Sequence, residues 1–94
     1  MYTVILQPAA EEEIEEAHVF IKQQSPLNAA RWFNGLVDAL ITLEHSPERC
    51  ALAPENDVFE PEIRQLIHSS FRVLFTVREE TVHTGGQPRR RSTP

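Results

Sequence analysis

The chain has 94 residues, of which 40% are hydrophobic and 24% are charged. This length and composition fit one small globular domain, and they exclude a two-domain chain and wholesale disorder. The chain has nine Lys and Arg and fourteen Asp and Glu. Three of the arginines lie among the last six residues, so residues 1–84 carry a net charge of −8. Such an acidic body disfavours broad, non-specific nucleic-acid binding, although a small local basic site for nucleic acid stays open.

We expect no membrane segment, secretory leader or cofactor site. The apolar runs are far shorter than the ~20 residues that span a bilayer, and the glutamates at positions 11–13 come too early for an apolar leader. The single cysteine, Cys50, cannot form an internal disulfide and has no Cys or His at a metal-like spacing. These features favour a cytoplasmic protein with no metal and no other cofactor.

Two consecutive helices are predicted after a short first strand. Residues 2–6 are rich in β-branched and aromatic side chains, which favours a strand. Apolar residues then recur on one face of a helix over residues 8–24. Ser25 and Pro26 are typical of the start of a second helix, which should end near residue 45. Because almost no linker separates the two helices, they should pack as an antiparallel hairpin.

The second half of the chain alternates with the period of strands. After a proline-rich loop at residues 47–61, this alternation predicts strands at residues 62–68, 71–78 and 81–83. The expected fold is therefore α+β, a strand and a helix hairpin followed by an antiparallel sheet, with a domain over residues 1–84 and a disordered basic tail over residues 85–94. The last strand stops so early that it should leave an open sheet edge.

One apolar stripe from the helices and strands should form the core. Its predicted members are Ile14, Phe33, Leu36, Leu40, Phe71, Val73 and Phe75. Arg72 lies on the opposite face of its strand from Phe71, Val73 and Phe75, because side chains alternate along a strand.

Several short motifs occur in an order that resembles a known family. In chain order they are YTVIL from Tyr2, PAAE from Pro8, SP at Ser25, AARWF from Ala29, SP at Ser46, IRQL from Ile63 and FRVLF from Phe71. Together they resemble the RelE/ParE superfamily of toxins from bacterial toxin–antitoxin pairs, also called plasmid stabilisation proteins, and most closely its ParE-like branch. The chain departs from the family pattern after His83, where the sequence looks unrelated, as a frameshift would produce.

The resemblance implies a helix hairpin on an antiparallel sheet, covered and neutralised by a small antitoxin. It further implies a toxin that either inhibits DNA gyrase or cleaves messenger RNA on the ribosome. Neither activity calls for a cofactor or a membrane.

Arg64 and Arg72 are the candidate partner-binding residues. They lie on neighbouring predicted strands, and pairing about the turn at residues 69–70 would bring them within a few residues of each other. Two guanidinium groups there could hold a phosphate, whereas surface arginines bridging to nearby acids are the alternative. His83 joins Arg64 and Arg72 as a candidate for catalysis, since imidazole titrates near neutral pH, but no catalytic set is assigned.

A ParE-like toxin that inhibits DNA gyrase and is neutralised by a cognate antitoxin is the favoured function. Binding to a protein needs surface shape more than a set of catalytic groups. The alternative is a RelE-like, ribosome-dependent mRNA endoribonuclease. The acidic body, the single lysine and the single tyrosine, Tyr2, count against this enzyme. An inactive remnant of such a toxin is the third hypothesis.

Overall fold

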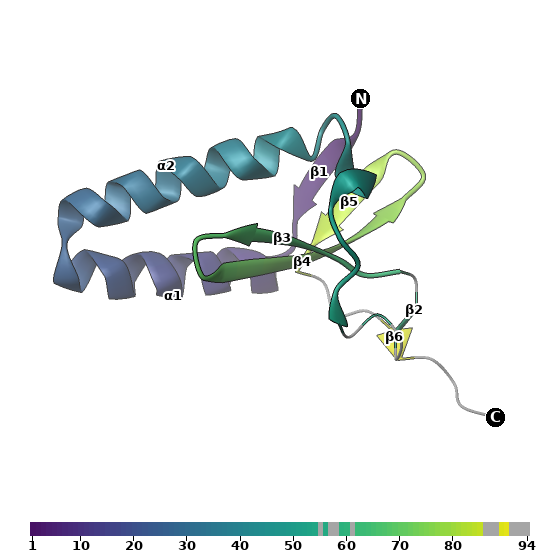
Figure 1. Ribbon diagram of the computed structural model, residues 1–94. Coiled ribbons are helices and arrows are strands. Elements are labelled where there is room, and N and C mark those ends of the chain that lie inside the picture. Colours follow the sequence, from purple (N-terminus) through teal and green to yellow (C-terminus); the bar gives the residue numbers. More distant parts are fainter. Residues whose placement is uncertain (55, 57–58, 61, 86–88, 91–94) are drawn as a thin grey trace.

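The computed structural model describes residues 1–54, 56, 59–60, 62–85 and 89–90. It is a two-layer α+β fold, in which a helix hairpin lies against a four-stranded sheet (Figure 1). The elements follow the predicted order of strand, two helices and three further strands. The predicted fold class is confirmed.

The two helices reverse direction at a single residue. Helix α1 spans Pro8–Gln24 and helix α2 spans Pro26–Thr42, each with proline in its first turn, where the missing N–H leaves no hydrogen bond unmade. The N–H of Ser25 donates to the carbonyl oxygen of Ile21, and its hydroxyl accepts from the N–H of Asn28 at 3.2 Å. Ser25 therefore ends one helix and begins the next, and the helices run antiparallel (Figure 1).

The sheet contains strands β1 (Thr3–Leu6), β3 (Arg64–His68), β4 (Phe71–Arg78) and β5 (Thr81–Thr84). Their spatial order is β1-β5-β4-β3, with β1 parallel to β5 and the other pairs antiparallel. Strand β5 thus lies inside the sheet, between β1 and β4. The expectation of an open edge at the last strand is wrong, because the N-terminal strand pairs with β5 and becomes the edge itself.

The core lies between the helices and the sheet. Its buried cluster consists of Ile14, Leu36, Leu40, Leu43, Val73, Phe75 and Val82, with Phe71 partly buried against it. Six of the seven predicted core residues thus lie in or against this cluster. The core also contains two residues that were not predicted. Leu43 directly follows α2, and Val82 lies in the short strand β5.

Phe33 is predicted in the core, but it is 40% exposed. Its ring contacts His18 of α1, with ring centroids 5.3 Å apart. Val37 and Ile41 follow Phe33 at intervals of four residues, one turn each, and are also exposed. The apolar stripe of α2 is therefore wider than the face that the sheet covers, and these three residues form an outer row on the helix.

His68 at the end of β3 holds α2 against the sheet. Its Nε2 lies 3.0 Å from the carbonyl oxygen of Trp32, and because a carbonyl only accepts, this nitrogen carries the proton. Gly35 leaves room for the ring, since a Cβ there would lie 2.7 Å from Cε1 of His68. The Trp32 ring also meets Phe71 edge-on at 5.4 Å between centroids.

The loop after α2 covers part of the β3 edge. It contains the 3-10 helix η1 (Pro47–Arg49), and an isolated bridge pairs Leu52 with Arg64. The N–H of Ile63 donates to Oδ1 of Asn56 at 2.8 Å. Because Ile63 is bonded to this loop, β3 begins two residues later than predicted.

A separate two-stranded ladder pairs β2 (Phe59–Glu60) with β6 (Arg89–Arg90) in antiparallel register. Strand β6 and Gly85 belong to the predicted basic tail, residues 85–94, whose other residues lie outside the described part of the chain. Gly85 itself adopts a positive φ of 75° and donates its N–H to the carbonyl oxygen of Leu74.

Candidate partner-binding surfaces

The sheet register separates the two predicted partner-binding arginines. Arg64 pairs with Phe75, whereas Arg72 pairs with Ile67. Directly paired residues share a face, so Arg64 lies on the core face with Phe75, and Arg72 lies on the opposite, outer face. The expected joint cationic patch does not form, because the two pairs are offset by three positions along the strands, and an odd offset places side chains on opposite faces.

Arg64 is bonded to the loop that follows α2. Its Nη1 donates to the carbonyl oxygen of Cys50 at 2.7 Å and to that of Glu48 at 3.0 Å. Its Nη2 lies 3.8 Å from Oε1 of Glu62, and the Arg64 side chain is only 20% exposed. These contacts tie β3 to the loop around η1.

The surroundings of Arg64 are acidic. A small hollow of about 220 Å³ is lined by Glu48, Glu62, Arg64, Val77 and Glu79. Three carboxylates around one guanidinium repel an additional anion more than the arginine attracts it. This hollow is therefore a poor phosphate site.

The outer face of the sheet carries a different group of side chains. Arg72 and Arg78 are exposed on β4, six residues apart, with Leu74 and Thr76 between them on the same face. The Nη1 of Arg72 donates to Oε1 of Gln65 at 3.3 Å. His83 pairs directly with Thr76, so it shares this face and lies diagonally next to Arg78, at roughly 7–8 Å between Cα atoms. His83 is thus closer to Arg78 than to Arg72.

Arg78 is the residue of this outer face that the sequence-based selection missed. The alternation along β4 already places Arg78 on the same face as Arg72. The alternation does not predict that β4 pairs with β5, and this pairing brings His83 beside Arg78.

The only tyrosine lies away from the outer face. Tyr2 is partly buried against the core cluster, and its hydroxyl donates to the Glu48 carboxylate, 3.0 Å from Oε1. This hydrogen bond raises the pKa of the Tyr2 phenol above its usual value. Burial likewise raises the pKa of the Cys50 thiol, although Arg49 and Arg64 oppose it, so Cys50 is a weak nucleophile at neutral pH.

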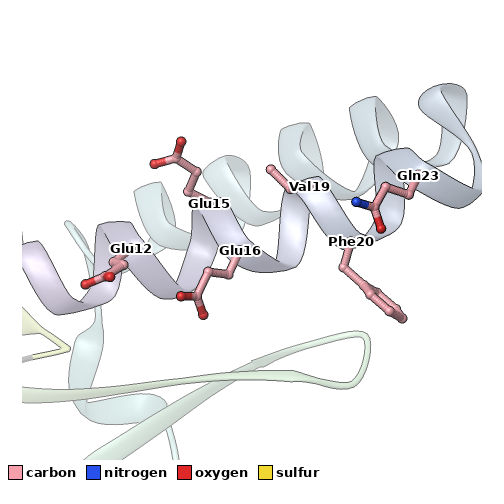
Figure 2. Close-up of a pocket in the computed structure, with 6 residues that line it drawn as sticks. All are labelled: Glu12, Glu15, Glu16, Val19, Phe20 and Gln23. Atoms are coloured by element: carbon pink, nitrogen blue, oxygen red, sulfur yellow. The ribbon is translucent and has the colours of Figure 1, made fainter.

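Helix α1 presents a third surface, on its side facing solvent. A shallow hollow of about 450 Å³ is lined by Glu12, Glu15, Glu16, Val19, Phe20 and Gln23. Figure 2 shows Glu16 and Phe20 pointing to one side of the helix, and Glu15 and Val19 to the other. Val19 is 46% exposed and Phe20 is 63% exposed. We call these six residues the α1 face.

The described residues contain neither a membrane-spanning helix nor a cluster of metal-ligating side chains. No helix there is long and apolar enough to cross a membrane. Nor do three or more His, Cys, Asp or Glu side chains come together there as a metal site would require.

A known protein family matches most of the chain. The family model described as the ParE toxin of the type II toxin–antitoxin system parDE matches residues 4–84, from the first strand to the end of β5. A match over this much of the chain defines its class: the protein belongs to the ParE toxin family, within the RelE/ParE superfamily. A search of curated proteins found no match.

Proposed function

We propose that this protein is a toxin that inhibits DNA gyrase and is neutralised by a cognate antitoxin in the cytoplasm. The family match over residues 4–84 carries the proposal, since it makes the chain a toxin of a type II toxin–antitoxin system. The choice of gyrase over messenger RNA rests on the arrangement of polar side chains described above.

The outer sheet face is the proposed contact with the target. Arg72 and Arg78 are exposed there on a rigid strand, beside the half-buried His83. Arginines held in this way suit an acidic patch on a protein surface, because the backbone already fixes their positions. Arg64 contributes to partner binding indirectly, by holding β3 to the loop that follows α2.

RNA cleavage by this face is disfavoured. Attack by a 2′-hydroxyl needs a proton acceptor, a proton donor and cations around one phosphate. Tyr2, with its raised pKa and its bond to Glu48, lies with the core cluster. Arg64 faces the core side as well. Among the described residues of the sheet strands, the ionisable side chains on the outer face are those of Arg72, Arg78 and His83.

Controlled expression in bacteria tests the proposal. The wild-type chain should arrest growth with filamentation and DNA damage, while messenger RNA on translating ribosomes stays intact. Co-expression of the antitoxin should restore growth. Cleavage of ribosome-bound messenger RNA, abolished by both Arg72→Ala and His83→Ala, would instead support the endoribonuclease. Soluble protein with no phenotype would support the inactive remnant.

A further inference from the structure

We propose that two copies of this chain pair through the outward side of α2, with the two helices antiparallel and related by a two-fold axis. The contact surface, which we call the α2 seam, consists of Leu27, Ala30, Asn34, Val37 and Ile41. This inference does not rest on the proposed function. It concerns the helix layer, and the outer face of the sheet stays free in the pair.

The residues of the α2 seam are spaced as in a coiled coil. They follow one another at intervals of three, four, three and four residues, which is the a/d repeat over two heptads. Leu27 and Ile41, at the two ends, are 61% and 48% exposed, and Val37 is 36% exposed. Ala30 and Asn34 are exposed as well. Such a repeat keeps its side chains on one narrow stripe, which fits a second helix.

The α2 seam points away from the core. The inner side of α2 carries Leu36 and Leu40, which are buried, and Trp32, whose ring meets Phe71 of the sheet. Figure 1 shows α2 at the border of the fold, with α1 along one side of it. The seam is therefore a contiguous, exposed stripe with apolar residues at four of its five positions, and stripes of this kind mark protein interfaces.

The charges beside the seam identify a second copy of the chain as the partner. Arg31 and Asp38 are both exposed and one heptad apart, so they lie on the same flank of the seam. The ion pair found within the described residues joins Arg64 to Glu62, so these two charges are available. In a symmetric antiparallel pair the same flank of both helices meets, and Arg31 of each copy faces Asp38 of the other. One symmetric contact thus forms two ion pairs.

The packing across the two-fold axis is self-complementary as well. With the axis between Asn34 and Val37, Ala30 of one copy lies opposite Ile41 of the other, so small side chains face large ones. The two Asn34 side chains come within about one helical turn of each other beside the axis, where their amides can hydrogen-bond. A single Asn at such a position fixes the register of a helix pair, at a cost in stability.

Other occupants satisfy fewer of these groups. In a parallel pair, the charged flank meets the opposite flank of the partner helix, where Phe33 and Leu40 lie. A wholly apolar helix leaves Asn34 without a hydrogen-bond partner at the centre of the contact, which costs free energy. The antiparallel self-pairing is the arrangement that uses both charges and the amide.

Sedimentation equilibrium of the purified full chain tests the proposal. A contact of about four helical turns belongs to the small, transient interfaces, so we expect a dissociation constant on the order of 10–100 µM. Salt at about 0.15 M screens the repulsion between the two acidic chains beyond about 8 Å. Val37→Ala with Ile41→Ala should weaken the dimer at least about tenfold. Val19→Ala with Phe20→Ala, in exposed apolar residues of α1, is the matched control and should leave the dissociation constant within about twofold.

A charge exchange tests the antiparallel geometry itself. Arg31→Glu makes every flanking charge acidic, and Asp38→Arg makes every one basic, so each variant alone should dimerise about tenfold more weakly than the wild type. An equimolar mixture of the two variants should form a heterodimer at least as tight as the wild-type dimer, because opposite charges then meet at both contacts. Glu13→Lys, away from the seam, should rescue neither variant.

Each outcome decides for or against the α2 seam. A chain that stays monomeric at about 1 mM overturns the inference. So does a dimer that the seam variants and the α1 control weaken equally, or a mixture of the charge variants that forms no heterodimer. All the substituted side chains are exposed, so circular dichroism should show an unchanged fold. At concentrations far below the dissociation constant, where the chain is monomeric, the seam variants should keep the stability of the wild type.

Discussion

Arg64 and Arg72 have the same side chain and lie on neighbouring strands, yet they lie on opposite faces of the sheet. Arg64 donates to two backbone carbonyls of the loop after α2 and is mostly shielded from solvent. Arg72 is exposed on the outer face and contacts Gln65. Composition marks both as cations, but only the strand register distinguishes an arginine that stabilises the fold from one that can reach a partner.

Replacing Arg64 tests this distinction. Arg64→Ala should lower the free energy of unfolding by about 1–3 kcal/mol, because two carbonyl oxygens lose a charged donor. Arg31→Ala, in an exposed residue of α2, should change it by less than about 0.5 kcal/mol. Urea unfolding of both variants provides the measurement. Equal stabilities for the two variants would contradict the structural role of Arg64.

At the scale of elements, local patterns predict the helices and strands well. Ser25, Pro8 and Pro26 fix the helix ends, and alternation around Val73 and Phe75 fixes the inner face of β4. What these patterns cannot provide is how far one layer covers another. Phe33 satisfies the helical spacing but lies in the outer row, and β5 becomes central only because β1, distant in sequence, pairs with it.

Two phenylalanine substitutions measure that difference in coverage. Phe75→Ala should cost about 3–5 kcal/mol, because the side chain is fully enclosed by the core cluster and leaves a cavity. Phe33→Ala should cost only about 1 kcal/mol, since its ring is already 40% exposed and less apolar area is lost. Thermal and urea unfolding would compare them. A larger loss for Phe33→Ala than for Phe75→Ala would reverse the assignment of inner and outer rows.

Gly85 joins β5 to α1 in a way that only glycine permits. A Cβ at this position would lie 2.2 Å from Cβ of Ala10 and 2.8 Å from its Cα. The positive φ of Gly85 adds strain for any other residue. Gly85→Ala should therefore destabilise the fold by about 2–4 kcal/mol.

A second variant separates the two causes. Ala10→Gly removes the nearest atom but not the backbone contact or the strain, so it should restore only part of the stability that Gly85→Ala loses. Unfolding curves for the single and double variants form the required cycle. Full recovery in the double variant would show that backbone strain at Gly85 contributes nothing.

At the scale of the whole molecule, the two layers present surfaces of opposite character. The helix layer carries the acidic and apolar α1 face, and the sheet layer carries Arg72 and Arg78 on its outer face. A net charge of −8 over residues 1–84 describes neither surface correctly, because it averages the two. Composition could therefore disfavour broad nucleic-acid binding, but it could not show that acidic and basic side chains gather on different layers of the fold.

Inhibition of purified DNA gyrase tests the central claim most directly. The wild-type chain should block supercoiling of relaxed plasmid, and the antitoxin should reverse the block. Arg72→Ala with Arg78→Ala should raise the concentration needed for half-inhibition on the order of tenfold, whereas Arg31→Ala should not change it. Normal supercoiling at a large excess of folded wild-type chain, with cleavage of messenger RNA on ribosomes by the same preparation, would contradict the account.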